Sequence, residues 1–114
     1  MKPGDVVLVR FPFADLAATK KRPALVLART ARSPRNRLAT LAMITSQIES
    51  LKLDGDVVLK EWKVAGLLHP SLLRLAKIAT VDEDLIDKSI GKLSSSDQGA
   101  ARQAFRHVFS TWLR

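Results

Sequence analysis

The stretch KKRPALVL, residues 20–27, joins three positive charges and a proline to an uninterrupted apolar run. An apolar run of this length, opened by a proline that sheets tolerate at the start of a strand, predicts a buried β-strand over residues 24–28. Lys20, Lys21 and Arg22 therefore stand directly before a rigid element. Two interpretations are open here: a solvated charge run, or an anion site fixed to the start of the strand.

The rest of the pattern predicts a small, curled, mostly antiparallel sheet or barrel with helices. Five short strands are expected, at residues 6–11, 24–28, 38–45, 57–59 and 72–78. The first of these is apolar on both faces, which predicts a covered strand. Loops or turns are expected at residues 14–21, at residues 31–37 and at the hairpin-type signal Asp54-Gly55. Short helices are predicted at residues 61–67 and 82–88.

The clearest element is an amphipathic helix near the C-terminus. Ser95 and Gln98 form the S-x-x-Q pattern of a capping box. Apolar residues then recur at helical spacing, at Ala101, Ala104, Phe105, Val108, Phe109 and Trp112. We expect this aromatic stripe to pack on the sheet; stacking on RNA bases is the alternative.

Length and composition indicate one soluble domain covering residues 1–114. The sequence contains no cysteine, which excludes a disulfide framework and a thiolate nucleophile. It shows neither a signal peptide nor an apolar run of about 18 residues. We therefore expect a cytoplasmic protein with no membrane partner.

Positive charge dominates the first half of the chain. The net charge is +8, from 19 basic and 11 acidic residues, and no acid falls between Asp15 and Glu49. The basic residues in that interval are Lys20, Lys21, Arg22, Arg29, Arg32, Arg35 and Arg37. The acids gather later, at Asp82, Glu83, Asp84 and Asp87. This asymmetry favours a polyanionic partner, with nucleic acid first and an acidic protein second.

Polar side chains at the ends of the expected strands are the candidates for chemistry. If the strands at residues 24–28 and 38–45 are antiparallel neighbours, Arg22 lies beside Thr45. A guanidinium next to a hydroxyl on rigid backbone suits a phosphate group, although an arginine before a strand is often only solvated. Arg74 and Lys77 add positive charge on the strand at residues 72–78.

Other chemistries find little support in the sequence. His69, in the loop sequence LLHPS, and His107, on the terminal helix, are of the residue type that moves protons near neutral pH. Neither histidine has a partner pattern. No metal-ligand spacing and no phosphate-binding glycine motif is present. The sequence thus predicts no metal and no cofactor.

A set of motifs, taken in order, resembles the MazF/PemK family of toxins from type II toxin–antitoxin modules. The motifs are PGDVVLVRFPFADL, KKRPALVLART, AMITSQ, GDVVLKEWKVAGLLHPS, LLRLAKIATVDEDLI and IGKLSSSD. They extend from residue 3 to about residue 97. Each motif is weak alone, and their order carries the resemblance.

The resemblance implies a small SH3-like barrel with added helices, working as a homodimer. It implies a sequence-specific, metal-independent endoribonuclease that cleaves single-stranded RNA, mRNA included, by attack of the 2′-hydroxyl on its own phosphate. A cognate antitoxin protein would block the RNA groove. Carried over by motif, Arg22 and Thr45 would be the catalytic pair. The RNA-binding residues would be Lys20, Lys21, Ser46, Gln47, Arg74 and Lys77.

Two departures from the family pattern keep alternatives open. The loop before the RP motif, AATKK at residues 17–21, lacks the glycine of many relatives. Ala76 stands where some relatives carry an aspartate, so the group that moves protons is not identified. The alternative function is a non-catalytic nucleic-acid or protein binder on the same barrel, either resembling topoisomerase poisons or an inactive toxin relative.

Overall fold

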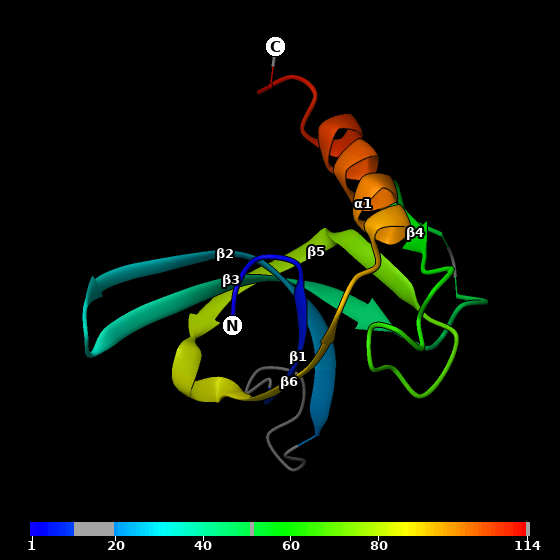
Figure 1. Cartoon of the computed structure of the whole chain (residues 1–114). Helices are drawn as coiled ribbons and strands as arrows, with labels where there is room; N and C mark the ends of the chain where they lie inside the picture. Colours follow the sequence, from blue (N-terminus) through cyan, green and yellow to red (C-terminus); the bar gives the residue numbers. More distant parts are fainter. Residues whose placement is uncertain (11–19, 51, 114) are drawn as a thin grey trace.

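Two central strands, β2 (Lys21–Ser33) and β3 (Asn36–Thr45), organise a six-stranded antiparallel sheet in the order β4-β5-β3-β2-β1-β6 (Figure 1). The computed structural model describes residues 1–10, 20–50 and 52–113. The other elements are β1 (Asp5–Arg10), β4 (Asp56–Val58), β5 (Leu72–Asp82), the 3₁₀ helix η1 (Glu83–Leu85), β6 (Ile86–Lys92) and α1 (Ser95–Val108). The predicted fold, a curled antiparallel sheet with a C-terminal helix, is confirmed. The sheet is open, with β4 and β6 at its edges.

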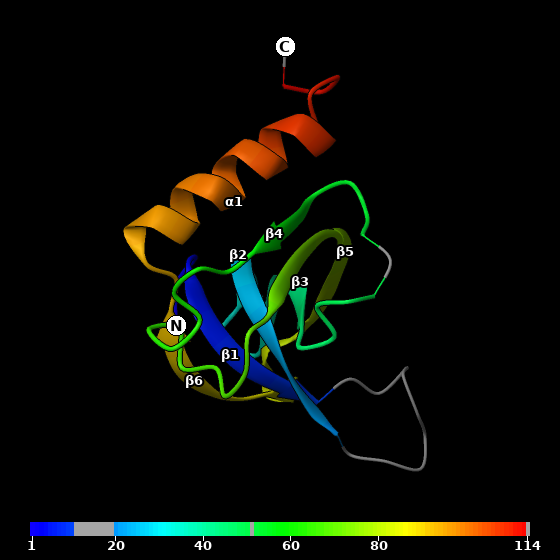
Figure 2. The same cartoon turned by 90° about the vertical axis from the view of Figure 1, so that its right-hand side faces the viewer.

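Both faces of this sheet are buried, because alternate residues of the central strands point to two separate apolar clusters. On β1, Val6 belongs to the first cluster, while Val7 and Val9 belong to the second. The covered-strand prediction is therefore confirmed. The first cluster also includes Leu25, Ala42, Ile44, Leu59, Leu73, Leu75, Leu93 and Ala101; the second also includes Ala24, Val26, Ala39, Leu41 and Val81. α1 covers the side of the sheet that holds the first cluster (Figure 2).

A bulge in β5 interrupts its pairing with β3. Ala42 of β3 pairs with Ile78, but the next residue, Met43, pairs with Arg74. Residues 75–77 thus have no partner in the β3 ladder, which bends the bulged strand. The first part of β5 pairs with β4 as well as with β3. The turn at Asp54-Gly55 is confirmed, with Gly55 at φ 90°, but it leads into a strand that pairs with β5 rather than forming a hairpin with the chain before it.

The chain after β4 crosses β6 at a point where only glycine fits. The helix predicted at residues 61–67 is wrong: this segment forms hydrogen-bonded turns, and Gly66 takes φ 80°. A Cβ on Gly66 would overlap the carbonyl oxygen of Ile90, and a Cβ on Gly91 would lie 2.5 Å from the carbonyl carbon of Ala65. The two backbones therefore touch directly, and this crossing fixes the segment against the β6 edge of the sheet.

The turn predicted within residues 31–37 is confirmed at Pro34 and Arg35, but the loop predicted on either side of it is wrong. β2 and β3 remain paired to Ser33 and Asn36, with a tight turn between them, and form a ribbon that extends beyond the rest of the sheet (Figure 1). The partner strand supplies the backbone hydrogen bonds that the local sequence alone could not indicate. The loop predicted at residues 14–21 lies largely outside the described residues; its last member, Lys21, begins β2.

The helix predicted at residues 82–88 is replaced by two shorter elements. Only η1 is helical, and β6 begins immediately after it at Ile86. The reason is pairing over a long sequence distance, since Val9 and Leu8 of β1 pair with Ile86 and Lys88. The sheet therefore has six strands instead of the five expected.

The N-terminal cap of α1 lies one residue before the predicted capping box. The hydroxyl of Ser94, not Ser95, accepts the backbone N–H of Asp97 at 3.1 Å. The Asp97 carboxylate is buried and accepts the backbone N–H groups of Lys60 and Glu61, at 3.1 and 2.9 Å. These bonds hold the start of α1 against the chain that follows β4.

The aromatic stripe of α1 packs on the sheet only in part. Ala101 is buried and Ala104 packs against the first cluster. The Phe105 and Phe109 rings contact each other at 4.7 Å between centroids, and Phe105 is 36% exposed. Trp112, beyond the end of the helix, is 86% exposed. The packing prediction thus holds for the first turns and is wrong for Trp112.

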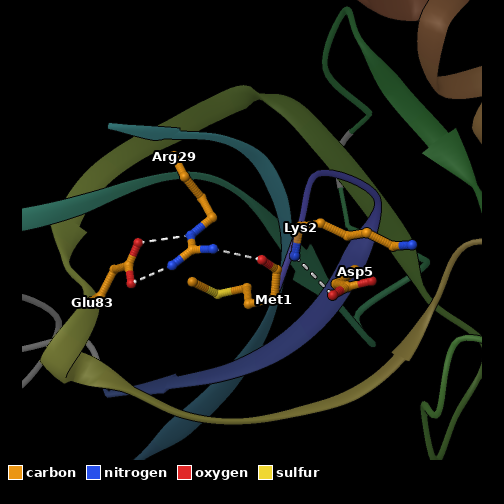
Figure 3. Close-up of polar contacts among 5 residues, drawn as sticks. All are labelled: Met1, Lys2, Asp5, Arg29 and Glu83. Carbon is orange, nitrogen blue, oxygen red and sulfur yellow. Dashed lines mark hydrogen bonds and ion pairs between the residues drawn. The ribbon is translucent and has the colours of Figure 1, made fainter. Parts of the chain in front are cut away.

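An exposed arginine of β2 joins distant parts of the chain. The Arg29 guanidinium donates to both carboxylate oxygens of Glu83, at 2.8 and 2.9 Å, and to the backbone oxygen of Met1 at 2.8 Å (Figure 3). The backbone N–H of Lys2 donates to Asp5 nearby. The hydrogen bond from Arg29 lowers the pKa of Glu83 below its usual value. This pair connects β2 to η1, which leads from β5 into β6.

Gly91→Ala is expected to lower the free energy of unfolding by about 1–3 kcal/mol, because the new methyl group overlaps backbone atoms that cannot turn aside. Gly99→Ala, at an open position of α1, is the matched control and should raise that free energy by about 0.5–1 kcal/mol. Urea unfolding followed by tryptophan fluorescence measures both. A stabilising effect of both substitutions would contradict the backbone crossing.

Glu83→Gln is expected to make the stability of the protein less sensitive to acid. Because the folded-state pKa of Glu83 is lowered, its contribution is complete above the unfolded value of about 4.3 and disappears as pH falls through the folded value. The stability difference between parent and variant should therefore be largest near pH 7 and shrink below about pH 4. Urea unfolding across this range tests it, with the exposed Glu49→Gln as control; a difference that grew toward low pH would be inconsistent with the Arg29 pair.

Candidate functional site

Arg22 and Thr45 come together as the sequence predicted, because β2 and β3 are antiparallel neighbours. The ladder between these strands starts at the pair Ala24–Met43, and Arg22 and Thr45 each lie two residues beyond that pair. Both residues line one cavity of about 490 Å³. The other described residues of this pocket are Leu8, Lys21, Pro23, Ile44, Ser46, Gln47, Gly66, Leu67, Leu68, His69, Ser71, Lys88 and Ile90. We call this cavity the β2–β3 pocket.

The hydroxyl of Thr45 is held in place by the turn that follows β3. Its oxygen accepts the backbone N–H of Gln47 at 3.1 Å. A hydroxyl that accepts one bond keeps its own proton for donation. Thr45 therefore has a fixed oxygen and a hydrogen that can point at an anion in the pocket. Ser46 and Gln47, both exposed, extend the polar rim from the same turn.

Arg74 supports the turn that follows β3. It is buried, 9% exposed, and its Nε lies 3.6 Å from the Asp56 carboxylate. Its Nη2 donates to the hydroxyl of Ser50, which donates in turn to the backbone oxygen of Gln47 at 2.8 Å. The structure thus places Arg74 behind the turn and outside the described lining of the pocket. The predicted direct contact of Arg74 with RNA stays a prediction.

The remaining predicted contact residues lie in different places. Lys21 lines the pocket and donates to Asp87 of β6 at 3.0 Å, which lowers the pKa of that carboxyl. Lys20 is exposed just before β2. Lys77 is exposed in the β5 bulge, outside the described lining of the pocket. Of the six predicted RNA-binding residues, the structure therefore brings Lys21, Ser46 and Gln47 together with the Arg22–Thr45 pair.

The pocket is rich in positive charge and hydrogen-bond donors. Lys21 and Arg22 of β2 and Lys88 of β6 supply the cationic groups. No aspartate or glutamate is among its described lining residues. An anion with several acceptor oxygens, such as a phosphodiester, matches this composition.

His69 lies at the candidate site, a position that the sequence pattern did not indicate. It sits in the connection between the turns after β4 and the start of β5, and it lines the same pocket as Arg22 and Thr45. More than twenty residues separate it from Thr45 in sequence, and no local pattern links the two. Only the path of the chain over β6 brings this imidazole to the end of β3.

The sequence of this chain matches one protein family over most of its length. Residues 2–109 match the model of the PemK-like, MazF-like toxins of type II toxin–antitoxin systems. The chain belongs to this family. No curated protein sequence matches it at a significant level.

Solved structures agree with the fold of this toxin. The Mycobacterium tuberculosis toxin MazF-mt6 superposes with a TM-score of 0.71 at 24% identity, over 93% of this chain and 96% of that one. MazF from Deinococcus radiodurans gives 0.67 at 18% identity, over 96% of each chain. A mycobacterial endoribonuclease in complex with its cognate antitoxin gives 0.70 at 13% identity, over 96% of this chain and 93% of that one. At these identities the likeness concerns the fold.

The toxin has a second, larger groove between α1 and the sheet. Its volume is about 710 Å³ and its lining is mostly apolar, with Leu27 and Ile78 on the sheet and Phe105 and Phe109 at the helix. Arg102 and Arg106 stand at its helix side.

The described residues contain neither a candidate metal site nor a membrane-spanning helix. In residues 1–10, 20–50 and 52–113, no group of three or more histidine, cysteine, aspartate or glutamate residues is placed to hold a metal ion. None of the helices in those ranges has the length and apolar character to cross a membrane.

Proposed function

We propose that this toxin is a metal-independent endoribonuclease that cleaves single-stranded RNA, including mRNA, at preferred short sequences. The observation that carries the proposal is the shared pocket of Arg22 and Thr45, lined by further cations and free of carboxylates among its described residues. The fold likeness to a mycobacterial endoribonuclease supports it.

Arg22 and Thr45 have complementary parts in this reaction. The RNA 2′-hydroxyl attacks the adjacent phosphorus, the bond to the 5′-oxygen breaks, and the products are a cyclic phosphate and a 5′-hydroxyl end. Arg22 is always charged and presents a planar pair of donors, so it stabilises the extra negative charge of the five-coordinate transition state. Thr45 donates to a non-bridging oxygen. The pocket holds the 2′-hydroxyl beside the phosphorus that it attacks, and this proximity lowers the barrier to the reaction.

RNA binding is assigned to the basic residues around this pair. Lys20 and Lys21 contact backbone phosphates, and Ser46 and Gln47 contact the strand at the rim of the pocket. Lys21 exchanges its contact with Asp87 for a phosphate when RNA arrives. Lys77 and Arg74 contact RNA outside the pocket lining. Arg74 also supports the turn that carries Gln47.

The partners and location are part of the same proposal. A cognate antitoxin with an acidic segment inhibits the toxin by covering the cationic pocket; one structural relative is a complex with its cognate antitoxin. Two copies of the chain form a homodimer, which the apolar groove beside α1 and the exposed Trp112 support. The absence of cysteine suits the reducing cytoplasm.

A non-catalytic binder on the same fold is the second candidate. Ala76, exposed in the β5 bulge, offers no carboxylate where the resemblance places an aspartate in some relatives. In this second candidate the missing carboxylate has abolished cleavage, while antitoxin binding is kept.

Arg22→Ala is expected to reduce cleavage by at least about 10²-fold with the fold intact, because it removes a transition-state donor at an exposed position. Cleavage of a long single-stranded RNA in EDTA, with the product ends mapped, measures this. Discrete cuts with 5′-hydroxyl ends are expected from the parent. Lys92→Ala, at an exposed position of β6 outside the described linings of both cavities, is the control.

Parental cleavage by a folded Arg22→Ala protein would end the assignment of Arg22. Absence of cleavage by a folded parent that binds RNA would favour the non-catalytic binder.

Neutralising phosphate-binding residues should weaken RNA affinity without moving the cut site. Lys20→Gln and Lys21→Gln, together with changes at the exposed Arg32, Arg35 and Arg37, are expected to reduce the slope of log K against log salt by about 0.7 for each lost phosphate contact. Fluorescence anisotropy over a salt series gives the slope, and end mapping gives the cut site. A changed cleavage sequence would mean that these residues read bases.

A further inference from the structure

The proposed reaction requires a proton acceptor that the Arg22–Thr45 pair does not supply. The 2′-hydroxyl must lose its proton as it attacks phosphorus. Arg22, Lys21 and Lys88 are donors, and arginine in particular has no acceptor capacity. Hydroxyl and amide oxygens, such as those of Ser46 and Gln47, are weak bases.

His69 fills this requirement in the described pocket. Among the described lining residues it is the single imidazole, and no carboxylate competes for the task. Histidine is the side chain whose ordinary titration falls between pH 5 and 8 and whose neutral ring accepts a proton at nitrogen. We propose that His69 is the general base that takes the proton of the attacking 2′-hydroxyl, an inference that rests on the proposed RNA cleavage.

The chain holds His69 in a short connection that is anchored on both sides. Leu67 before it and Leu72 after it are buried. Gly66 presses on the backbone of β6, and Pro70 restricts the chain immediately after the histidine. The hydroxyl of Ser71 donates to the backbone oxygen of His69 at 2.8 Å. The backbone is thus fixed while the imidazole stays exposed to an incoming RNA strand.

The proton balance of the step is complete with water. The neutral imidazole of His69 accepts the 2′-hydroxyl proton as the new O–P bond forms. The bond from phosphorus to the 5′-oxygen breaks, and that oxygen takes a proton from water. The imidazolium returns its proton to solvent after the products leave. Arg22 stays charged throughout and stabilises the phosphorane.

The test compares His69→Gln with the parent on an oligoribonucleotide that carries a site cut by the parent. Single-turnover cleavage is measured from pH 5 to pH 9. The parent rate should rise with pH through the histidine range, and the variant should lose about 10²–10⁴-fold and that rising limb. Added imidazole should restore part of the lost activity. His107→Gln, exposed on α1, is the matched control and should cleave like the parent.

Binding of the same oligonucleotide with a 2′-deoxy substitution at the cut site separates chemistry from affinity. His69→Gln should bind it within a few-fold of the parent. A large rate loss with an unchanged pH profile would reduce His69 to a positioning role and overturn the proposal.

If His69→Gln cleaved RNA at the parental rate while Arg22→Ala lost cleavage, His69 would not be the general base. The proposed ribonuclease function would still hold. A folded parent that cuts no RNA would overturn both.

Discussion

The antiparallel pairing of β2 with β3 is the constraint on which the rest of the molecule depends. These strands lie at the centre of the sheet, so each of the two apolar clusters receives residues from them. The same register that buries Leu25 and Ala42 brings the start of β2 to the end of β3. A slip of one residue would turn the apolar side chains to the wrong faces and separate Arg22 from Thr45. Stability and site geometry therefore share one determinant.

Several carboxylates of this toxin stabilise the fold, while the charged side chains in the described lining of the β2–β3 pocket are cations. Glu83 holds Arg29, Asp87 holds Lys21, and Asp97 holds backbone N–H groups at the start of α1. The late cluster of acids thus neutralises part of the early cluster of bases across the folded sheet. Arg22 and Lys88 line the pocket and supply it with positive charge.

The site is supported from behind by a short chain of contacts. Asp56 pairs with Arg74, Arg74 donates to Ser50, and Ser50 donates to the backbone of Gln47. Gln47 in turn donates its backbone N–H to Thr45. A buried charge pair is costly to break, because either partner alone would be left uncompensated. The orientation of the Thr45 hydroxyl is thereby tied to the β4–β5 part of the sheet, which packs against α1.

The sequence by itself determined the fold class, the C-terminal helix and the likeness to the toxin family, because apolar periodicity and ordered motifs are local properties. It also indicated that Arg22 and Thr45 lie close together. Both stand at the ends of predicted strands, and the only assumption needed was that these strands are antiparallel neighbours. Where partner strands supply the hydrogen bonds, the local pattern failed. It predicted a loop on either side of the turn between β2 and β3, and it assigned the start of β6 to a helix. Only the tertiary structure decided that Arg74 turns inward to Asp56 and that His69 reaches the pocket. The position of Arg74 depends on the β5 bulge, and that of His69 depends on the Gly66–Gly91 crossing. Each arises from contacts between segments far apart in the chain, so no single stretch of sequence encodes it.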